Sequence, residues 1–107
     1  MPVINIEYDD EKLGKDEILT LSKAIQKIVS ETTKIEDVFV YANSAKIKVK
    51  IAPIEIFVQM SAHKIKDVDK LMSEIKSKLA NWKKEKRFHH LINLTLTPMN
   101  WKIEIGI

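Results

Sequence analysis

Hydrophobic and polar residues alternate in several short runs along the chain, which is the pattern of β-strands with one buried face. The first run, residues 3–8 (VINIEY), alternates isoleucine with asparagine and glutamate. Later runs are rich in β-branched and aromatic side chains. The predicted strands are 3–8, 38–42, 46–51, 53–58, 91–97 and 101–105, with turns at 43–44 and 98–100.

Two longer stretches place hydrophobic residues three and four positions apart, which is the spacing of one face of an α-helix. The first stretch runs from about 15 to 32 and the second from about 64 to 83. We therefore predict two amphipathic helices. Their hydrophobic stripes are Ile18, Leu21, Ile25, Ile28 and Val29 in the first, and Ile65, Val68, Leu71, Met72, Ile75, Leu79 and Trp82 in the second.

The order strand, helix, strand, strand occurs twice, so the sequence contains two β-α-β-β repeats, about 2–51 and about 53–106. A crossover from a strand through a helix to a parallel strand is right-handed, and it places the helix on one face of the sheet. We therefore predict an α+β fold in which one domain, residues 1–107, forms a four-stranded sheet with both helices on one face.

The other face of the predicted sheet has no helix to cover it, although it carries both apolar and polar side chains. Apolar surface of this kind is commonly buried against another chain, so we expect a homo-oligomer. The short strands predicted at 46–51 and 101–105 would extend the sheet of a neighbouring subunit.

Composition excludes several kinds of chemistry. The chain has 107 residues, no cysteine and two glycines, which excludes disulfides, thiolate nucleophiles, sulfur-based zinc sites and glycine-rich phosphate loops. The histidines are His63, His89 and His90. Because adjacent histidines on a strand point to opposite faces, we expect no metal site, and we also expect no cofactor.

The net charge of +3 admits an anionic partner. Arg87 is the only arginine, whereas recognition of nucleic acid relies on arginine, so we expect no nucleic-acid partner. We interpret the basic run 83–87 primarily as the lysine-rich end of a helix, and the alternative interpretation is an anion-binding patch. No apolar run approaches the roughly 20 residues of a membrane span, and the N-terminus lacks a signal-peptide layout. We therefore expect a cytoplasmic protein that does not contact a membrane.

Proline follows the initiator methionine and opens the first predicted strand. If Met1 is removed, the nitrogen of Pro2 becomes a secondary amine with a pKa of roughly 8 or below. Burial against apolar neighbours lowers that pKa further, because desolvation disfavours the cation. The result is a neutral general base near physiological pH. A proline at the start of a strand is also an ordinary structural choice, so both interpretations stay open here.

Three features together resemble the tautomerase superfamily: the Met-Pro start that leads into a strand, the paired β-α-β units, and the segments 32–38 (TTKIEDV) and 91–94 (LINL). The two-repeat length is similar to that of macrophage migration inhibitory factor and the carboxymethyl-hydroxymuconate isomerases. This resemblance implies a homotrimer with active sites near the subunit interfaces, each built around the amine of Pro2. It also implies that the proline removes a proton beside a carbonyl and returns it elsewhere.

The resemblance implies further site residues. Lys34 matches a family lysine at the end of the first helix and would bind a carbonyl or carboxylate. Asn93 matches an asparagine that lines the pocket of the neighbouring subunit. Lys12 stands where some relatives carry a carboxylate-binding arginine, and Phe39 stands where a second arginine occurs. Trp101 would supply an aromatic wall. For each lysine, an exposed solvated charge is the alternative interpretation.

We therefore predict a small tautomerase or isomerase that acts on an enolisable keto acid, or on its enol, with Pro2 as general base once Met1 is removed. The alternative is a catalytically silent oligomer of the same fold that binds an anionic partner. The two differ in whether the nitrogen of Pro2 is an amine or an amide.

Overall fold

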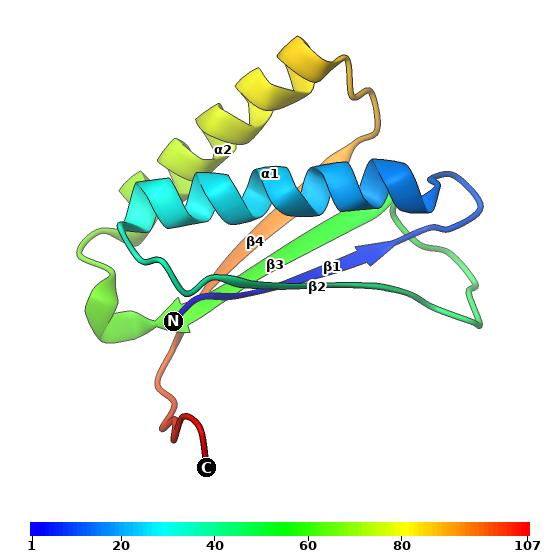
Figure 1. Cartoon of the computed structure of the whole chain (residues 1–107). Coiled ribbons are helices and arrows are strands. Elements are labelled where there is room, and N and C mark those ends of the chain that lie inside the picture. The colour runs from blue at the N-terminus through cyan, green and yellow to red at the C-terminus, as the bar shows by residue number, and fades with distance from the viewer.

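A computed structural model describes the whole chain, residues 1–107, as a four-stranded sheet with two helices against one face (Figure 1). The other face of the sheet is open. Neither helix is long and apolar enough to cross a membrane. In chain order the elements are β1 (Val3–Tyr8), α1 (Lys15–Thr33), β2 (Phe39–Ser44), β3 (Ile54–Ser61), the 3-10 turn η1 (Ala62–Lys64), α2 (Val68–Lys86) and β4 (Ile92–Met99).

The strands lie in the order β2-β1-β3-β4. β1 is parallel to β2, and β3 is parallel to β4, whereas the two central strands β1 and β3 are antiparallel. Each helix thus connects two parallel neighbours, and both helices cover the same face. This arrangement confirms the predicted α+β fold class.

Both predicted helices are confirmed, and the second lies a few residues further along the chain, since it ends at Lys86 instead of about 83. α1 covers the expected residues, but α2 begins at Val68 instead of 64. Residues 62–64 form η1, and Asp67 then caps α2. The carboxylate of Asp67 accepts a hydrogen bond from the backbone N–H of Lys70 at 3.1 Å, which satisfies one of the free donors of the first turn.

Two of the predicted strands are wrong. Residues 46–51 and 101–105 are irregular and pair with no strand of the sheet. Residues 43–44 and 98–99, which the sequence pattern places in turns, extend β2 and β4 instead. Alternation decides which way side chains point, but a strand also needs a neighbour for its backbone N–H and C=O groups. Neither segment has such a neighbour within one chain.

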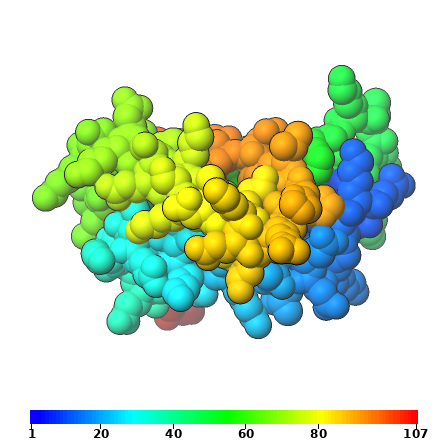
Figure 2. Space-filling view, turned by 90° about the horizontal axis from the view of Figure 1, so that it is seen from above, coloured from blue at the N-terminus to red at the C-terminus, as the bar shows by residue number.

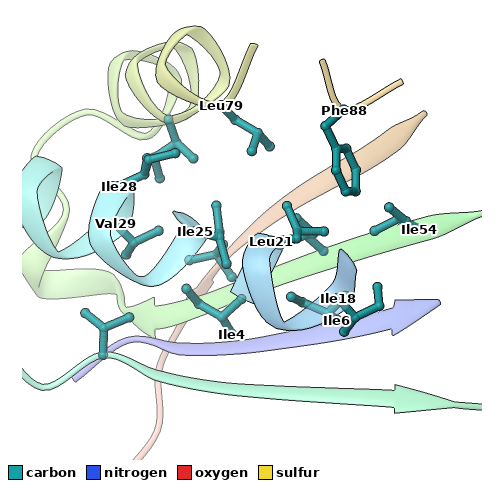
Figure 3. Close-up of a cluster of buried hydrophobic side chains, with 14 of the residues drawn as sticks. Ile4, Ile6, Ile18, Leu21, Ile25, Ile28, Val29, Ile54, Leu79 and Phe88 are labelled. Carbon is teal, nitrogen blue, oxygen red and sulfur yellow. The ribbon is translucent and has the colours of Figure 1, made fainter. Parts of the chain in front are cut away.

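The hydrophobic core fills the space between the helices and the covered face of the sheet (Figure 3). Alternate residues of β1 and β3 point into this space and meet one stripe of each helix. Burial of each large aliphatic side chain contributes about 1.5–3 kcal/mol to stability. The residues with no exposed surface are Ile4, Ile6, Leu21, Ile25, Val29, Ile54, Ile56, Val58 and Ile75.

The open face of the sheet carries the residues that alternate with the core positions. Its middle row runs across all four strands and consists of Tyr41, Asn5, Phe57 and Thr95. Tyr41 is 55% exposed. Two aromatic side chains in such a row leave apolar surface in contact with water in a single chain.

Candidate functional site

Pro2 lies directly before the central strand β1 and is buried, with less than 2% of its surface exposed. Its carbonyl oxygen accepts a hydrogen bond from the backbone N–H of Phe39 at 3.1 Å, which extends the pairing of β1 with β2 by one residue. The side chain of Phe39 supplies no charge at this end of the sheet. The sheet thus holds Pro2 in a fixed position that is shielded from water.

Trp101 lies at the same end of the sheet as Pro2. Its indole N–H donates a hydrogen bond to the hydroxyl of Ser61 at 2.8 Å. Ser61 ends β3, and Val3 faces Gln59 in the antiparallel pairing of β1 with β3, so Ser61 lies level with the residues that precede Val3. The hydrogen bond therefore fixes the indole near the start of β1. Ser61 was not among the predicted site residues, and its only signal in the sequence is a polar residue at the end of a hydrophobic strand.

Lys34 also lies at this end, because α1 runs back along the sheet from the far end of β1. Lys34 is exposed and adopts a left-handed backbone conformation at the C-terminus of α1. Two hydrogen bonds hold the connection to β2 in place. The hydroxyl of Ser30 donates to the carbonyl of Ile35 at 2.7 Å, and the amide of Gln26 donates to the carbonyl of Val38 at 3.2 Å.

Lys12 and Asn93 lie at the opposite end of the sheet within one chain. Lys12 follows the last residue of β1, and Asn93 pairs with Glu55 at the start of β3, where its amide donates to the glutamate carboxylate at 3.3 Å. A strand rises about 3.3 Å per residue, so the length of β1 separates both residues from Pro2 by roughly 17 Å. One chain therefore brings Lys34 and Trp101 to the proline end, but not these two residues.

Lys48, Asp9 and Asp10 form an ionic clamp at that opposite end, and none of them was among the predicted site residues. The ammonium of Lys48 donates to a carboxylate oxygen of Asp9 at 3.2 Å and also contacts Asp10. The backbone N–H of Glu11, together with Lys48, lowers the pKa of Asp9, and the hydrogen bond from Lys48 lowers the pKa of Asp10. Asp10 in turn raises the pKa of Lys48. The clamp ties the segment 45–52 to the end of β1, beside a hollow of about 550 Å³.

A second polar contact joins the start of α1 to the start of β4. A ring nitrogen of His90 lies 2.8 Å from the carboxylate of Glu17, and this hydrogen bond lowers the pKa of Glu17. Glu17 also accepts from the backbone N–H of Gly14 at 3.4 Å. His63 is in η1, at the other end of the sheet. No three histidine, aspartate or glutamate side chains come together as metal ligands.

Solved structures share this arrangement. The chain is similar to malonate semialdehyde decarboxylase, in a series that includes a mutant with alanine in place of its first-position proline (TM-score 0.71, 7% identity, 98% of this chain and 92% of that chain). It is similar to a fused 4-OT that forms an asymmetric trimer (TM-score 0.70, 10% identity, 97% of this chain and 92% of that chain). It is also similar to MIF2 of Leishmania major (TM-score 0.67, 13% identity, 99% of this chain and 95% of that chain). No family model and no curated protein matches the sequence. At these identities the likeness shows a common fold.

Proposed function

The chain has the fold of the tautomerase superfamily, and on that premise we propose that it is a small tautomerase or isomerase. Its substrate is an enolisable keto acid, and the reaction moves a proton from the carbon beside the carbonyl. The observation that supports this proposal most directly is the burial of Pro2 at the head of the central strand. Removal of Met1 leaves the nitrogen of Pro2 as an amine at the head of this strand, beside apolar core residues.

The proposed reaction needs no other reagent. The lone pair of the Pro2 nitrogen takes the proton from the carbon, so that a C–H bond breaks and an N–H bond forms. The electron pair of that C–H bond forms a new C=C bond, and the π pair of the carbonyl moves on to its oxygen, which becomes an enolate. The proton then returns from nitrogen to the oxygen or to another carbon. Burial favours this cycle because it favours the neutral amine over the ammonium.

Lys34 and Trp101 are the parts of the proposed site that the same chain supplies beside Pro2. The ammonium of Lys34 stabilises the negative oxygen of the enolate or holds the carboxylate of the keto acid. The indole of Trp101, fixed by Ser61, forms an apolar wall that excludes water. Both lie at the proline end of the sheet, which is the geometric support for this assignment.

Asn93 and Lys12 reach a Pro2 site only if another subunit supplies them. Along the strand direction, each is separated from Pro2 of its own chain by about the length of β1, roughly 17 Å or more. We therefore assign Asn93 to the Pro2 site of a neighbouring copy in a homotrimer, where its amide donates to a substrate oxygen. Lys12 attracts the substrate carboxylate as a point charge. The uncovered aromatic row of the open sheet face supports such an assembly.

The test combines a measurement of the intact mass of the protein with a keto–enol assay on phenylpyruvate. We expect protein without Met1 to be active and Pro2→Ala to lose at least about 100-fold in kcat/KM, since general base catalysis contributes on that order. Pro53→Ala is the matched control, because Pro53 likewise opens a central strand and its carbonyl accepts the N–H of Asp9 at 2.9 Å, a bond that alanine keeps. Activity in protein that retains Met1, or equal activity in both variants, would contradict the role of Pro2.

The second candidate is a catalytically silent oligomer of this fold that binds an anionic partner. The observation that favours it is the concentration of lysines on the outer face of the helices, far from the open face of the sheet. Binding of an anionic partner that is unchanged in Pro2→Ala, in protein without keto–enol activity, would select this candidate.

A further inference from the structure

A groove runs between α1 and α2 on the face of the helices that points away from the sheet. Figure 2 looks down on this face, with α1 in blue to cyan and α2 beside it in green to yellow. The groove has a volume of about 650 Å³. It is lined by six residues of α1 (Thr20, Lys23, Ala24, Lys27, Ile28 and Glu31) and five of α2 (Lys78, Asn81, Trp82, Glu85 and Lys86).

The floor of the groove is apolar and well supported. Ala24 and Ile28 come from α1, and the indole of Trp82 comes from α2. The ring of Trp82 packs against that of Phe88, with the centroids 5.2 Å apart and the rings tilted by 46°. A small residue beside a fixed indole leaves room for a large apolar side chain from a partner.

The rims of the groove are basic. Lys23 and Lys27 lie one helical turn apart on α1, and Lys78 and Lys86 lie one turn to either side of Trp82 on α2. Like charges four positions apart on a helix are mildly destabilising, so the Lys23–Lys27 pair is not explained by the stability of α1. The hydroxyl of Thr32 accepts from Lys78 at 2.8 Å.

Only two carboxylates line the same groove. Glu31 lies 4.0 Å from the ammonium of Lys27, and both side chains are well exposed, so this ion pair neutralises the rim only weakly. Glu85 is the other carboxylate. Four lysines against two glutamates leave the groove with an excess of positive charge above an apolar floor.

We propose that this groove binds an acidic amphipathic helix of a partner protein. From Thr20 to Glu31 the groove spans 31 − 20 = 11 residue steps of α1, which corresponds to about 16 Å, or three helical turns. Carboxylates four positions apart on a bound helix lie about 6 Å apart along its axis, which matches the spacing of Lys23 and Lys27. One large apolar side chain of that helix packs on Trp82, in the manner of other helix-in-groove complexes.

Three other occupants fit the groove less well. A phosphate backbone would meet Glu31 and Glu85 at the rims, and the groove has no arginine for phosphate recognition. A membrane surface is flatter than a groove whose apolar residues form the floor. A second copy that docked groove to groove would place lysines against lysines. The proposed site lies on the opposite side of the sheet from the open face, so it depends neither on the proposed trimer nor on catalysis by Pro2.

The experiment uses a labelled synthetic peptide of about 15 residues with leucines along one face and glutamates on both flanks. Its affinity is measured by fluorescence anisotropy at low and high salt, against a peptide with lysine in place of glutamate. The groove variant is Lys23→Glu with Lys86→Glu. The control variant is Lys76→Glu with Lys84→Glu, two exposed lysines of α2 outside the groove. Each pair changes the net charge from +3 to 3 − 4 = −1, so the two variants have the same net charge.

We expect the acidic peptide to bind saturably and the lysine peptide not to bind. The affinity for the acidic peptide should fall at least about tenfold in the groove variant and change less than about twofold in the control variant. Circular dichroism checks that both variants fold. Equal weakening in the two variants would mean that only net charge matters, and it would overturn the proposal. Absence of binding by the acidic peptide, or tighter groove-dependent binding of single-stranded oligothymidine or anionic vesicles, would overturn it as well.

Discussion

The residue that follows each helix is basic, and its backbone is in the left-handed region: Lys34 at φ 60° after α1 and Arg87 at φ 53° after α2. Glycine is the usual residue at this position because it has no Cβ atom to clash. A residue with a side chain there costs about 1–2 kcal/mol of conformational energy. At Lys34 the proposed contact with the substrate gives a reason to keep a side chain despite that cost.

Replacing each of these two residues by glycine tests whether its side chain is kept for function. We expect Lys34→Gly and Arg87→Gly each to raise the free energy of unfolding by about 0.5–1 kcal/mol, since glycine relieves the backbone strain. Only Lys34→Gly should also lower keto–enol activity, by about tenfold or more. Denaturant unfolding and the phenylpyruvate assay measure the two effects. Loss of activity in both variants, or in neither, would argue against a role for the Lys34 ammonium.

The clamp of Lys48 with Asp9 and Asp10 makes stability depend on pH in a defined direction. The pKa values of both aspartates are lowered from 3.8, so their contribution is present above that pH and is lost as the pH falls through the folded-state values. The pKa of Lys48 is raised from 10.5, so its contribution is present below that pH and is lost at higher pH. The clamp therefore stabilises the protein between these limits.

Lys48→Met removes the clamp and keeps most of the side-chain length. We expect its Tm to be lower than that of the wild type near neutral pH, and the two Tm values to converge as the pH falls below about 3.8. The contact between Glu17 and His90 is the same in both proteins, so its effect cancels in the difference. A Tm difference that is constant across this range would show that the aspartates do not couple to Lys48.

At the scale of the elements, the sequence predicts those structures that a chain completes by itself. A helix satisfies its own backbone hydrogen bonds, so the three-and-four spacing located α1 and α2 to within a few residues. The alternating segments 46–51 and 101–105 could not be judged in this way, because a strand depends on a partner that the pattern does not reveal. The same limit applies to the site, where position along the chain does not show that β1 separates Lys12 and Asn93 from Pro2.

The open sheet face gives an element-scale test of self-association. Phe57 lies in the middle row of that face and pairs with Asn5, and its side chain points away from the core on the other face of the sheet. We expect wild type to have the mass of a trimer in light scattering and Phe57→Lys to have that of a monomer, because a buried ammonium at the centre of an interface is strongly unfavourable. Ser77→Lys, an exposed position on α2, is the control. A wild type that is monomeric at micromolar concentration would refute the proposed assembly.

At the scale of the whole molecule, the two β-α-β units share one core. The buried cluster draws Ile4, Ile6 and Ile25 from the first unit and Ile54, Ile56 and Ile75 from the second. Neither unit alone covers its hydrophobic surface, so the repeat seen in the sequence is a repeat of pattern, and the cooperative unit is the complete sheet with both helices.

The strand order also brings the residues before β1 and the segment after β4 to one end of the sheet (Figure 1). A circular permutant that links these two segments and opens the chain within 45–52 would therefore keep every strand pairing. In that permutant the nitrogen of Pro2 would be an internal amide with no basic lone pair. Fold and proposed chemistry can thus be separated without changing a single side chain, because the reaction depends on where the backbone begins.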